Sequence, residues 1–450
     1  MRADPRLVLA GIAAALGFVV AGCGGRAAPV TIGVLADCVG PVGAYDDLFL
    51  ADAELPLLER GARLAGPRAS DGVVNASVAG RRVHLVSGCT EFSVYSRLIA
   101  EVRQLVEKDH ANIIIGPLGA PDGLVVRDYA RRHPNVVFLL TYSTAQEATL
   151  HDPAPNVFRF EPDGAQWVAG LGGYAFHVLG WRNVATVAEN SSVVWPEVAG
   201  FVAEFCSLGG HVVDPVWTRP YVPPHEKPQL PAYTRKVPAD VDGVALFSNY
   251  YQDTIGFARA YSKDHSDLAH SLIIGPSAFG VLGPLRRSGH LLEGVVTGLN
   301  QPFESNSPAF RAYARGFRKF FPHLAPQPSA PSDHLFAIPY RDAMEAALEA
   351  LESSHADLSQ GERAFRAALS RVVLQSPNGR ISLDRHRQAI APAYLSRVEL
   401  DSRGRPLLRT LRVVPNVEQT FGGYFNGTTP PPSSVSPTCR RAAPPPWARS

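Results

Sequence analysis

Two turns that follow apolar strands carry groups suited to holding a small ligand. A Gly-rich turn, residues 116–123, comes directly after the apolar residues 113–115, and the polar run 141–144 follows the apolar run 136–140. Hydroxyls and backbone N–H groups can together hold a carboxylate without a cationic side chain. The alternative is that both segments are ordinary turns that bind nothing.

The elements around these turns bring them together. An apolar strand, a turn, a helix over 124–132 and a second apolar strand follow one another, which is the order of a βαβ unit. The parallel strands of such a unit end at the same edge of the sheet, so both turns face one crevice. We interpret this crevice as the binding site.

The sequence contains no arrangement typical of an enzyme. Ser277 lies in Gly275-Pro-Ser-Ala-Phe279, which lacks the second glycine of a G-x-S-x-G nucleophile elbow. His225 is followed by Glu-Lys-Pro, without the second histidine of a zincin, and neither a P-loop nor a G-x-G-x-x-G motif is present. We therefore expect no enzyme activity and no cofactor, and an exported hydrolase is the least favoured alternative.

Strands and helices alternate along most of the chain. The strand and helix pattern repeats from residue 30 to 140, and the helix over 93–109 places Leu98, Val102 and Leu105 on one face. A second alternating series begins at residue 183. This alternation is the signature of an α/β fold.

The N-terminal residues are typical of an export signal. Two arginines precede the apolar run 7–20, which is too short to span a membrane and ends near Cys23. The sequence Val20-Ala-Gly-Cys23 resembles a bacterial lipobox, in which the thiol receives a diacylglyceryl group and the chain is cut just before it. We predict a signal peptide over 1–22, lipidation of Cys23 and a tether over 23–29. The alternative is ordinary secretion.

The composition is that of a globular chain, with 46% hydrophobic residues, 19% charged residues and a formal net charge of +2. Because the positive charge forms no basic stripe, we expect no nucleic-acid partner. About 430 residues remain after the signal, which is enough for two or three domains with their own cores.

Four cysteines follow Cys23, and an even number in an exported protein favours disulfides. None has C-x-x-C spacing or a neighbouring histidine, so we expect no metal site. Cys38 and Cys89 each follow one of two strands that are expected to be neighbours in a doubly wound sheet, which predicts a bridge between them. By elimination, Cys206 on a helix pairs with Cys439 in the tail.

Six short segments are informative in combination. They are the lipobox, Val30-Thr-Ile-Gly-Val-Leu35, Gly40-Pro-Val-Gly-Ala-Tyr45, Ile113-Ile-Ile-Gly-Pro117, Ser143-Thr-Ala-Gln-Glu147 and Ser376-Pro-Asn-Gly-Arg-Ile-Ser-Leu-Asp384. In this order they resemble the branched-chain amino-acid-binding type of periplasmic substrate-binding protein, which are type I binding proteins of ABC transporters. The resemblance covers most of residues 30–415.

The resemblance implies two doubly wound, Rossmann-like α/β lobes joined by three hinge crossings, which close on a ligand like a clamp. The expected crossings are the segments 157–162, 292–302 and 374–381. The expected domains are lobe 1 (30–156 plus 300–376), lobe 2 (157–299 plus 377–425) and a Pro-rich tail (426–450). The tail is expected to be flexible or extended, and a Pro-rich insert, 215–238, to be a surface loop that can overhang the crevice.

The resemblance also implies which residues hold the ligand. They are Tyr45, Ala120, Tyr142, Ser143 and Thr144 in the first lobe, and Trp195, Tyr250 and Ser277 in the second. The hydroxyls suit a carboxylate, and the aromatic rings would sandwich an apolar or planar group. The alternative for each aromatic residue is a place in the core or at the rim.

The chain departs from the amino-acid-binding pattern at two places. Relatives usually have a hydroxyl residue where this chain has Gly119-Ala120, and an acidic residue for the ammonium where it has Gly275-Pro-Ser277. The second departure argues against a plain α-amino acid unless Asp253 or Glu189 substitutes. Relatives with such changes bind amides, urea-like compounds or aromatic acids.

We therefore predict a monomeric solute-binding lipoprotein, anchored at the outer face of the cytoplasmic membrane, that delivers a small polar solute to an ABC permease. The solute is an amino acid or a related amide or carboxylate. The alternative within the same fold is a sensor that signals to a membrane partner, and the sequence does not separate these two roles.

Overall fold

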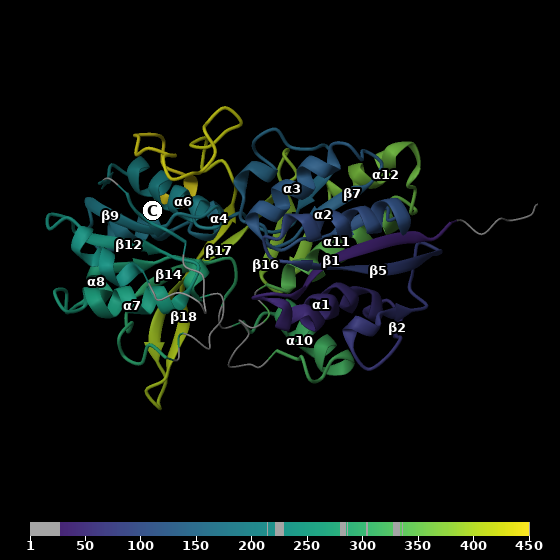
Figure 1. The fold of residues 1–450 in the computed structure, drawn as a ribbon, viewed down its shortest axis with the longest axis horizontal. Helices are drawn as coiled ribbons and strands as arrows, with labels where there is room; N and C mark the ends of the chain where they lie inside the picture. The colour runs from purple at the N-terminus through teal and green to yellow at the C-terminus, as the bar shows by residue number, and fades with distance from the viewer. Residues whose placement is uncertain are drawn as a thin grey trace, which may run out of the picture.

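The computed structural model describes residues 28–213, 215–220, 229–279, 285, 287–302, 305–326, 334 and 336–449. Two α/β lobes lie side by side, each built on its own β-sheet with helices on both faces (Figure 1). This arrangement confirms the predicted fold class. The signal peptide and Cys23 lie outside the described residues.

The first lobe contains a six-stranded sheet in which all strands but the short β4 run parallel. The strand order is β4 (Ser77–Val78), β5 (Arg81–Glu91), β1 (Val30–Val39), β6 (Ile113–Ile115), β7 (Val137–Leu140) and β8 (Val157–Arg159). β6 and β7 are apolar throughout because helices cover the sheet on both faces. The chain reverses its direction across the sheet between β1 and β6.

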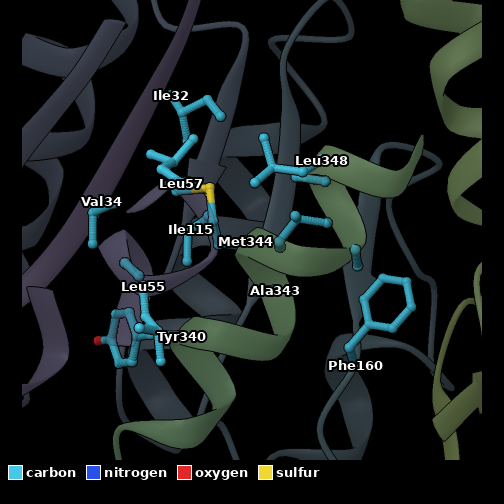
Figure 2. Close-up of a cluster of buried hydrophobic side chains, with 14 of the residues drawn as sticks. Ile32, Val34, Leu55, Leu57, Ile115, Phe160, Tyr340, Ala343, Met344 and Leu348 are labelled. Carbon is cyan, nitrogen blue, oxygen red and sulfur yellow. The ribbon is translucent and has the colours of Figure 1, made fainter. Parts of the chain in front are cut away.

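Four helices enclose this sheet. One face packs against α1 (Asp46–Glu59) and α11 (Ile338–Ser353), and the other against α2 (Tyr95–Arg103) and α3 (Ala120–Ala130). Figure 2 shows Met344 of α11 among sheet residues and α1 residues that are fully or almost fully buried. Helices α10 (Pro308–Phe320) and α12 (Ser359–Leu369) add to the same cluster.

The second lobe is built on a larger sheet. Its order is β10 (His211–Val212), β9 (Asn183–Glu189), β12 (Gly243–Phe247), β13 (Leu272–Ile274), β14 (Val296–Leu299), β17 (Ala389–Leu400), β16 (Gly379–Leu383) and β15 (Leu374–Ser376). β11 (Val216–Thr218) lies beside β9, and β18 (Pro406–Val417) lies beside β17. β9 to β14 are parallel and β17 is antiparallel. Helix α6 (Trp195–Ser207) covers one face and α7 (Tyr251–Tyr261) the other.

The chain passes between the lobes three times. The first passage follows β8 and leads to α4 (Gly164–Trp167), and the second follows β14 and leads to α10. The third lies within β17, because Ala391 packs in the first lobe's core and Ala393 in the second lobe's. Strands β15 (Leu374–Ser376) and β16 (Gly379–Leu383) pack on the first lobe, so this passage falls further along the chain than the segment 374–381.

Both predicted disulfides are present in the structure. Cys38 at the end of β1 pairs with Cys89 near the end of β5, with Cα atoms 5.3 Å apart. Cys206 of α6 pairs with Cys439, with Cα atoms 5.5 Å apart. In the chain-entropy model, closing the loop of 51 residues between the first pair contributes about 4 kcal/mol.

The C-terminal residues 426–449, which we call the strap, pack on the second lobe, where the sequence predicted a flexible or extended tail. The strap lies beside α6 (Figure 1). Its Trp447 is 7% exposed and meets the Phe421 ring edge-on at 5.1 Å, while Arg412 donates to the Trp447 carbonyl at 3.0 Å. The prolines prevent an α-helix, but a short 3₁₀ helix over Pro446–Ala448 places Trp447 and Ala448 in the second lobe's core.

The Pro-rich insert contributes more than a surface loop. It contains the edge strand β11 and a 3₁₀ helix over Leu230–Lys236, and Leu230 is fully buried. The Leu230 backbone N–H donates to Asp253 at 2.7 Å, which fixes the insert to α7. Residues 214 and 221–228 of the insert are outside the described part.

Within the described residues, no helix combines the length and the apolar character needed to cross a membrane.

The packing of the strap predicts a stability effect. Trp447→Ala should lower the free energy of unfolding by about 3 kcal/mol, because it removes a large buried side chain and leaves a cavity. Val435→Ala is the matched control, since Val435 in the same strap is 81% exposed and its truncation should change stability by less than about 0.5 kcal/mol. Urea unfolding with the disulfides intact measures both, and equal effects of the two substitutions would contradict the packing.

Candidate ligand-binding site

A cavity of about 420 Å³ lies between the two lobes. Its first-lobe lining consists of Pro41, Val42, Tyr45, Phe92, Leu118, Gly119, Ala120, Tyr142, Thr144 and Phe336. The second lobe contributes Val193, Asn249, Tyr250, Tyr251, Gln252 and Ser277. This volume is within the range of small-molecule sites.

The positions of these residues follow from the two sheets. In the first sheet the chain reverses between β1 and β6, and the segments after these strands supply Tyr45 and Ala120. In the second it reverses between β9 and β12, and the segments after these strands supply Val193 and Tyr250. Ligands in open α/β sheets bind at such reversals, beyond the carboxyl ends of the strands.

Six of the eight predicted ligand residues line this cavity, namely Tyr45, Ala120, Tyr142, Thr144, Tyr250 and Ser277. Ser143 and Trp195 are not among the lining residues. Ser143 is fully buried against Gly123 of α3, where an added Cβ would meet the Ser143 hydroxyl. The Trp195 indole N–H donates to Asn190 at 2.8 Å.

Six of the sixteen described residues that line the cavity are aromatic. Phe336 meets Tyr142 edge-on at 4.8 Å between ring centroids, and it also lies edge-on to Tyr45 at 6.3 Å. Trp167 supports Tyr142 from behind at 4.6 Å. Phe92, which directly follows β5, and Phe336, which precedes α11, were not predicted from the sequence. The wall is suited to a flat apolar group.

The first-lobe end of the cavity offers hydrogen-bond donors. Thr144 is 1% exposed, and its hydroxyl has no hydrogen-bond partner among the described residues. Helix α3 starts at Ala120, and the first-turn N–H groups of a helix have no partner within it. Gly119 precedes it with φ of +106°, and a side chain there would meet Asp122 and Phe92. The backbone turn therefore requires glycine at residue 119, which leaves no hydroxyl side chain there.

The second-lobe end of the cavity is also polar, but its hydroxyl group already has a hydrogen-bond partner. The Ser277 hydroxyl donates a short hydrogen bond to Glu197 Oε1, and Glu197 of α6 is fully buried. Burial raises the pKa of the Glu197 carboxyl to about 8, although the bonds from Ser277 act in the opposite direction. Glu197 is not among the lining residues, and its hydrogen bond with Ser277 connects it to the cavity.

Glu197 places a carboxyl group behind the segment 275–277, which has no acidic residue of its own. Neither Asp253 nor Glu189 lines the cavity: Asp253 accepts from Leu230, and Glu189 accepts from the Asn249 backbone N–H at 3.0 Å. Glu197 was not predicted from the sequence. Its one signal was an acidic residue in a helix that is otherwise largely apolar.

A buried arginine donates hydrogen bonds to the backbone of the turn that contains Thr144. Arg159 of β8 is fully buried and donates to the carbonyl oxygens of Ser143 and Ala145 at 2.7 and 2.6 Å. Its Nε donates to Gln388 Oε1 at 2.6 Å. The guanidinium therefore fixes the backbone on both sides of Thr144 and connects it to the residue just before β17.

The described residues contain no group of three or more His, Cys, Asp or Glu side chains placed to hold a metal ion. Charged side chains are also absent from the described cavity lining. The arrangement can bind and orient a small molecule through aromatic contacts and neutral hydrogen-bonding groups. Two lobes, a hinge of three chain passages and a cavity between the lobes define a solute-binding clamp.

Comparison with known proteins gives the family. The sequence matches the model of the periplasmic binding protein family over residues 29–405, and the chain belongs to this family. Its lobes have the type I arrangement. Among curated proteins, none matches the sequence significantly.

Solved structures share the fold. An ABC transporter substrate-binding protein from Sphaerobacter thermophilus has a TM-score of 0.73 and 22% identity, covering 87% of this chain and 99% of that one. A solute-binding protein from Rhodopseudomonas palustris in complex with 4-hydroxybenzoate has a TM-score of 0.70 and 16% identity, covering 87% and 98%. A leucine-binding protein from Thermotoga maritima has a TM-score of 0.65 and 17% identity, covering 86% and 99%.

The buried Glu197 predicts a pH dependence of stability. Its folded-state pKa of about 8 lies above the ordinary value of 4.5, so the folded protein holds a proton that the unfolded chain releases. Its contribution is therefore fully present below pH 4.5 and is lost as the pH rises to about 8, with a slope of at most about 1.4 kcal/mol per pH unit.

Glu197→Gln removes this titration and should flatten the fall in unfolding free energy between pH 5 and 8 relative to the wild type. Comparison of the two proteins at each pH cancels other buried carboxyls such as Glu54, whose pKa burial raises to about 9. Parallel pH profiles of wild type and variant would show that Glu197 does not hold this proton.

Proposed function

We propose that the protein is an extracytoplasmic substrate-binding lipoprotein that captures a small aromatic carboxylate between its lobes and delivers it to an ABC permease. The aromatic wall of the cavity is the observation that carries the ligand class. Tyr45, Phe92, Tyr142, Tyr250, Tyr251 and Phe336 all line it. A planar ring fills such a site with favourable edge and face contacts.

The first-lobe end of the cavity suits the carboxylate. Thr144 has a hydroxyl that can donate to it. Helix α3 begins at the lining residue Ala120, and its first turn, in which Pro121 has no N–H, offers the Ala120 and Asp122 N–H groups and the positive end of the helix dipole. Neutral donors in a partly dry cavity can hold an anion with useful strength. The cavity therefore needs no arginine or lysine for this ligand.

The ligands of two structural relatives define the two classes to be compared. The Rhodopseudomonas palustris protein is in complex with 4-hydroxybenzoate, and the Thermotoga maritima protein is a leucine-binding protein. The present cavity favours the first ligand type, because no ionised carboxylate among the described lining residues is available to an ammonium group. Leucine and isoleucine are the natural competitors in a binding test.

The hinge supports capture by closure. Each lobe contributes one side of the cavity, and three chain passages connect the lobes. Rotation about such a hinge brings the second-lobe residues onto a ligand that has already docked on the first lobe, which removes it from water. The closed form is the one that we expect the permease to recognise.

A substitution in the first-lobe end tests the ligand class. Wild-type protein should bind benzoate or 4-hydroxybenzoate more tightly than leucine or isoleucine, and Thr144→Val should weaken aromatic acid binding about tenfold by removing one donor to the carboxylate. Isothermal titration calorimetry measures these constants. Thr186→Val is the matched control, since Thr186 is fully buried, has an unpartnered hydroxyl and lies outside the cavity lining. Preferential binding of leucine would exclude the aromatic class.

A second substitution tests the anchor. In cells of a bacterial host, the wild-type protein should enter the detergent phase on phase separation and carry a lipid on Cys23, because acyl chains bind it to the membrane. Cys23→Ser should leave the protein in the aqueous phase without the lipid mass. Wild-type protein found only in the aqueous phase would favour ordinary secretion.

A further inference from the structure

The second-lobe end of the cavity is built to accept a hydrogen bond. Ser277 lines the cavity, and its hydroxyl proton points to Glu197 Oε1 behind the wall. A hydroxyl has one proton and two lone pairs. Glu197 keeps its own proton below a pH of about 8, and Oε2, which has no partner among the described residues, is the oxygen that carries it. Oε1 then accepts from Ser277, and the Ser277 oxygen is left to accept from a ligand.

The chain makes room for this pair at Gly275. A Cβ at that position would lie 2.8 Å from Glu197 Oε2 and would also collide with Phe247. The missing side chain lets the carboxyl approach the segment that carries Ser277. The segment 275–277 has no carboxyl group of its own, and the Glu197 carboxyl of α6 lies next to it instead.

In the described part of the chain, few other polar groups lie close to the Glu197 carboxyl. The titratable groups that face it are Glu189 at the end of β9 and Tyr142 across the cavity, and Glu189 already accepts the Asn249 N–H. Glu197 Oε2 has no partner among the described residues. Glu197 thus acts on the cavity through the orientation of the Ser277 hydroxyl.

We propose that Ser277, oriented by Glu197, selects ligands that carry a hydrogen-bond donor at the end facing the second lobe, such as a phenolic hydroxyl or an ammonium group. The inference rests on the proposed function for the other end of the ligand, where Thr144 and α3 take the carboxylate. Ser277 is the residue that contacts the ligand, and Glu197 is a positioning residue.

The physical basis is the cost of an unpaired acceptor. A ligand without a donor removes the Ser277 oxygen from water and returns no hydrogen bond, whereas a ligand with a donor pairs with it. A site with a buried hydrogen-bonding group strongly rejects a ligand that lacks the matching polar group. An apolar pocket rejects a ligand with an added hydroxyl less strongly. The pair therefore contributes to selectivity more than to overall affinity.

Affinity ratios between two matched ligands test the proposal. In the full mature chain, 4-hydroxybenzoate should bind at least about tenfold more tightly than benzoate, as measured by calorimetry. Ser277→Ala should bring this ratio to about one, and Ser277→Thr, which keeps the hydroxyl, should preserve it. Glu197→Gln should lower the ratio at least about threefold, because the amide can turn an N–H toward Ser277 and free the hydroxyl proton.

Thr144→Val is the matched control from the opposite end. It should weaken both aromatic acids equally and leave their ratio unchanged, since both carry the same carboxylate. A loss of folding in Ser277→Ala would appear in its thermal unfolding, and Glu197→Gln then provides the comparison. A purely structural role for Glu197 would weaken both ligands alike and would not change their ratio.

Other outcomes separate this inference from the proposed function. A wild-type ratio of about one, or a ratio that survives Ser277→Ala, overturns the donor selection while leaving the aromatic carboxylate class in place. If leucine binds and neither aromatic acid does, the ligand class fails, and leucine is compared with 4-methylpentanoate, which lacks the ammonium. Equal affinities in that comparison overturn the donor selection, and no binding by any of the four compounds overturns both proposals.

Discussion

The buried guanidinium of Arg159 is the constraint on which the rest of the site depends. A fully buried cation is tolerated only when acceptors replace its lost water, and here the carbonyls of Ser143 and Ala145 and the amide of Gln388 do so. Because these acceptors must face Arg159, the backbone around Thr144 can adopt only one course. The ligand-binding turn is thereby fixed before any ligand arrives.

The same network reaches the hinge. Gln388 donates to the Glu161 carbonyl and to Gln166 Oε1, both at 2.8 Å, and Asn300 donates to the Glu161 side chain. Glu161 belongs to the first passage between the lobes, Asn300 to the second, and Gln388 lies just before the third. The three passages therefore share one buried set of hydrogen bonds, which connects the turn that holds the ligand to the segments that must bend when the lobes close.

Burial affects the carboxyl groups differently from the arginine, because it favours their neutral, protonated form. Glu197 and Glu204 are fully buried, and burial raises their pKa values to about 8 and about 7. Each is placed for a local purpose: Glu204 accepts from the backbone N–H groups of Gly170 and Gly173, and Glu197 orients Ser277. A protonated carboxyl keeps its hydrogen-bonding geometry with a smaller desolvation cost, so the cavity stays neutral while remaining polar at its ends.

The sequence by itself determined what depends on local pattern. Apolar runs separated by amphipathic helices predict parallel sheets, and turns directly after strands meet at one sheet edge, so the turns that contain Ala120, Tyr142 and Thr144 could be placed at one crevice in advance. The Cys38–Cys89 pair followed from the same strand ends. These inferences need only the chain's immediate neighbourhood and the geometry of the βαβ unit. Tyr45, Tyr250 and Ser277 were predicted only through the family resemblance.

Only the tertiary structure decided the contacts between distant segments. Ser277 and Glu197 are 80 residues apart, Phe336 joins the cavity from beyond the second passage, and Trp447 finds the second lobe's core from a Pro-rich strap. No periodicity predicts such contacts, because they depend on how helices and loops pack once the sheets have formed. Local patterns thus determined the scaffold and the first-lobe turns of the site, whereas long-range packing determined the groups proposed to give the site its selectivity.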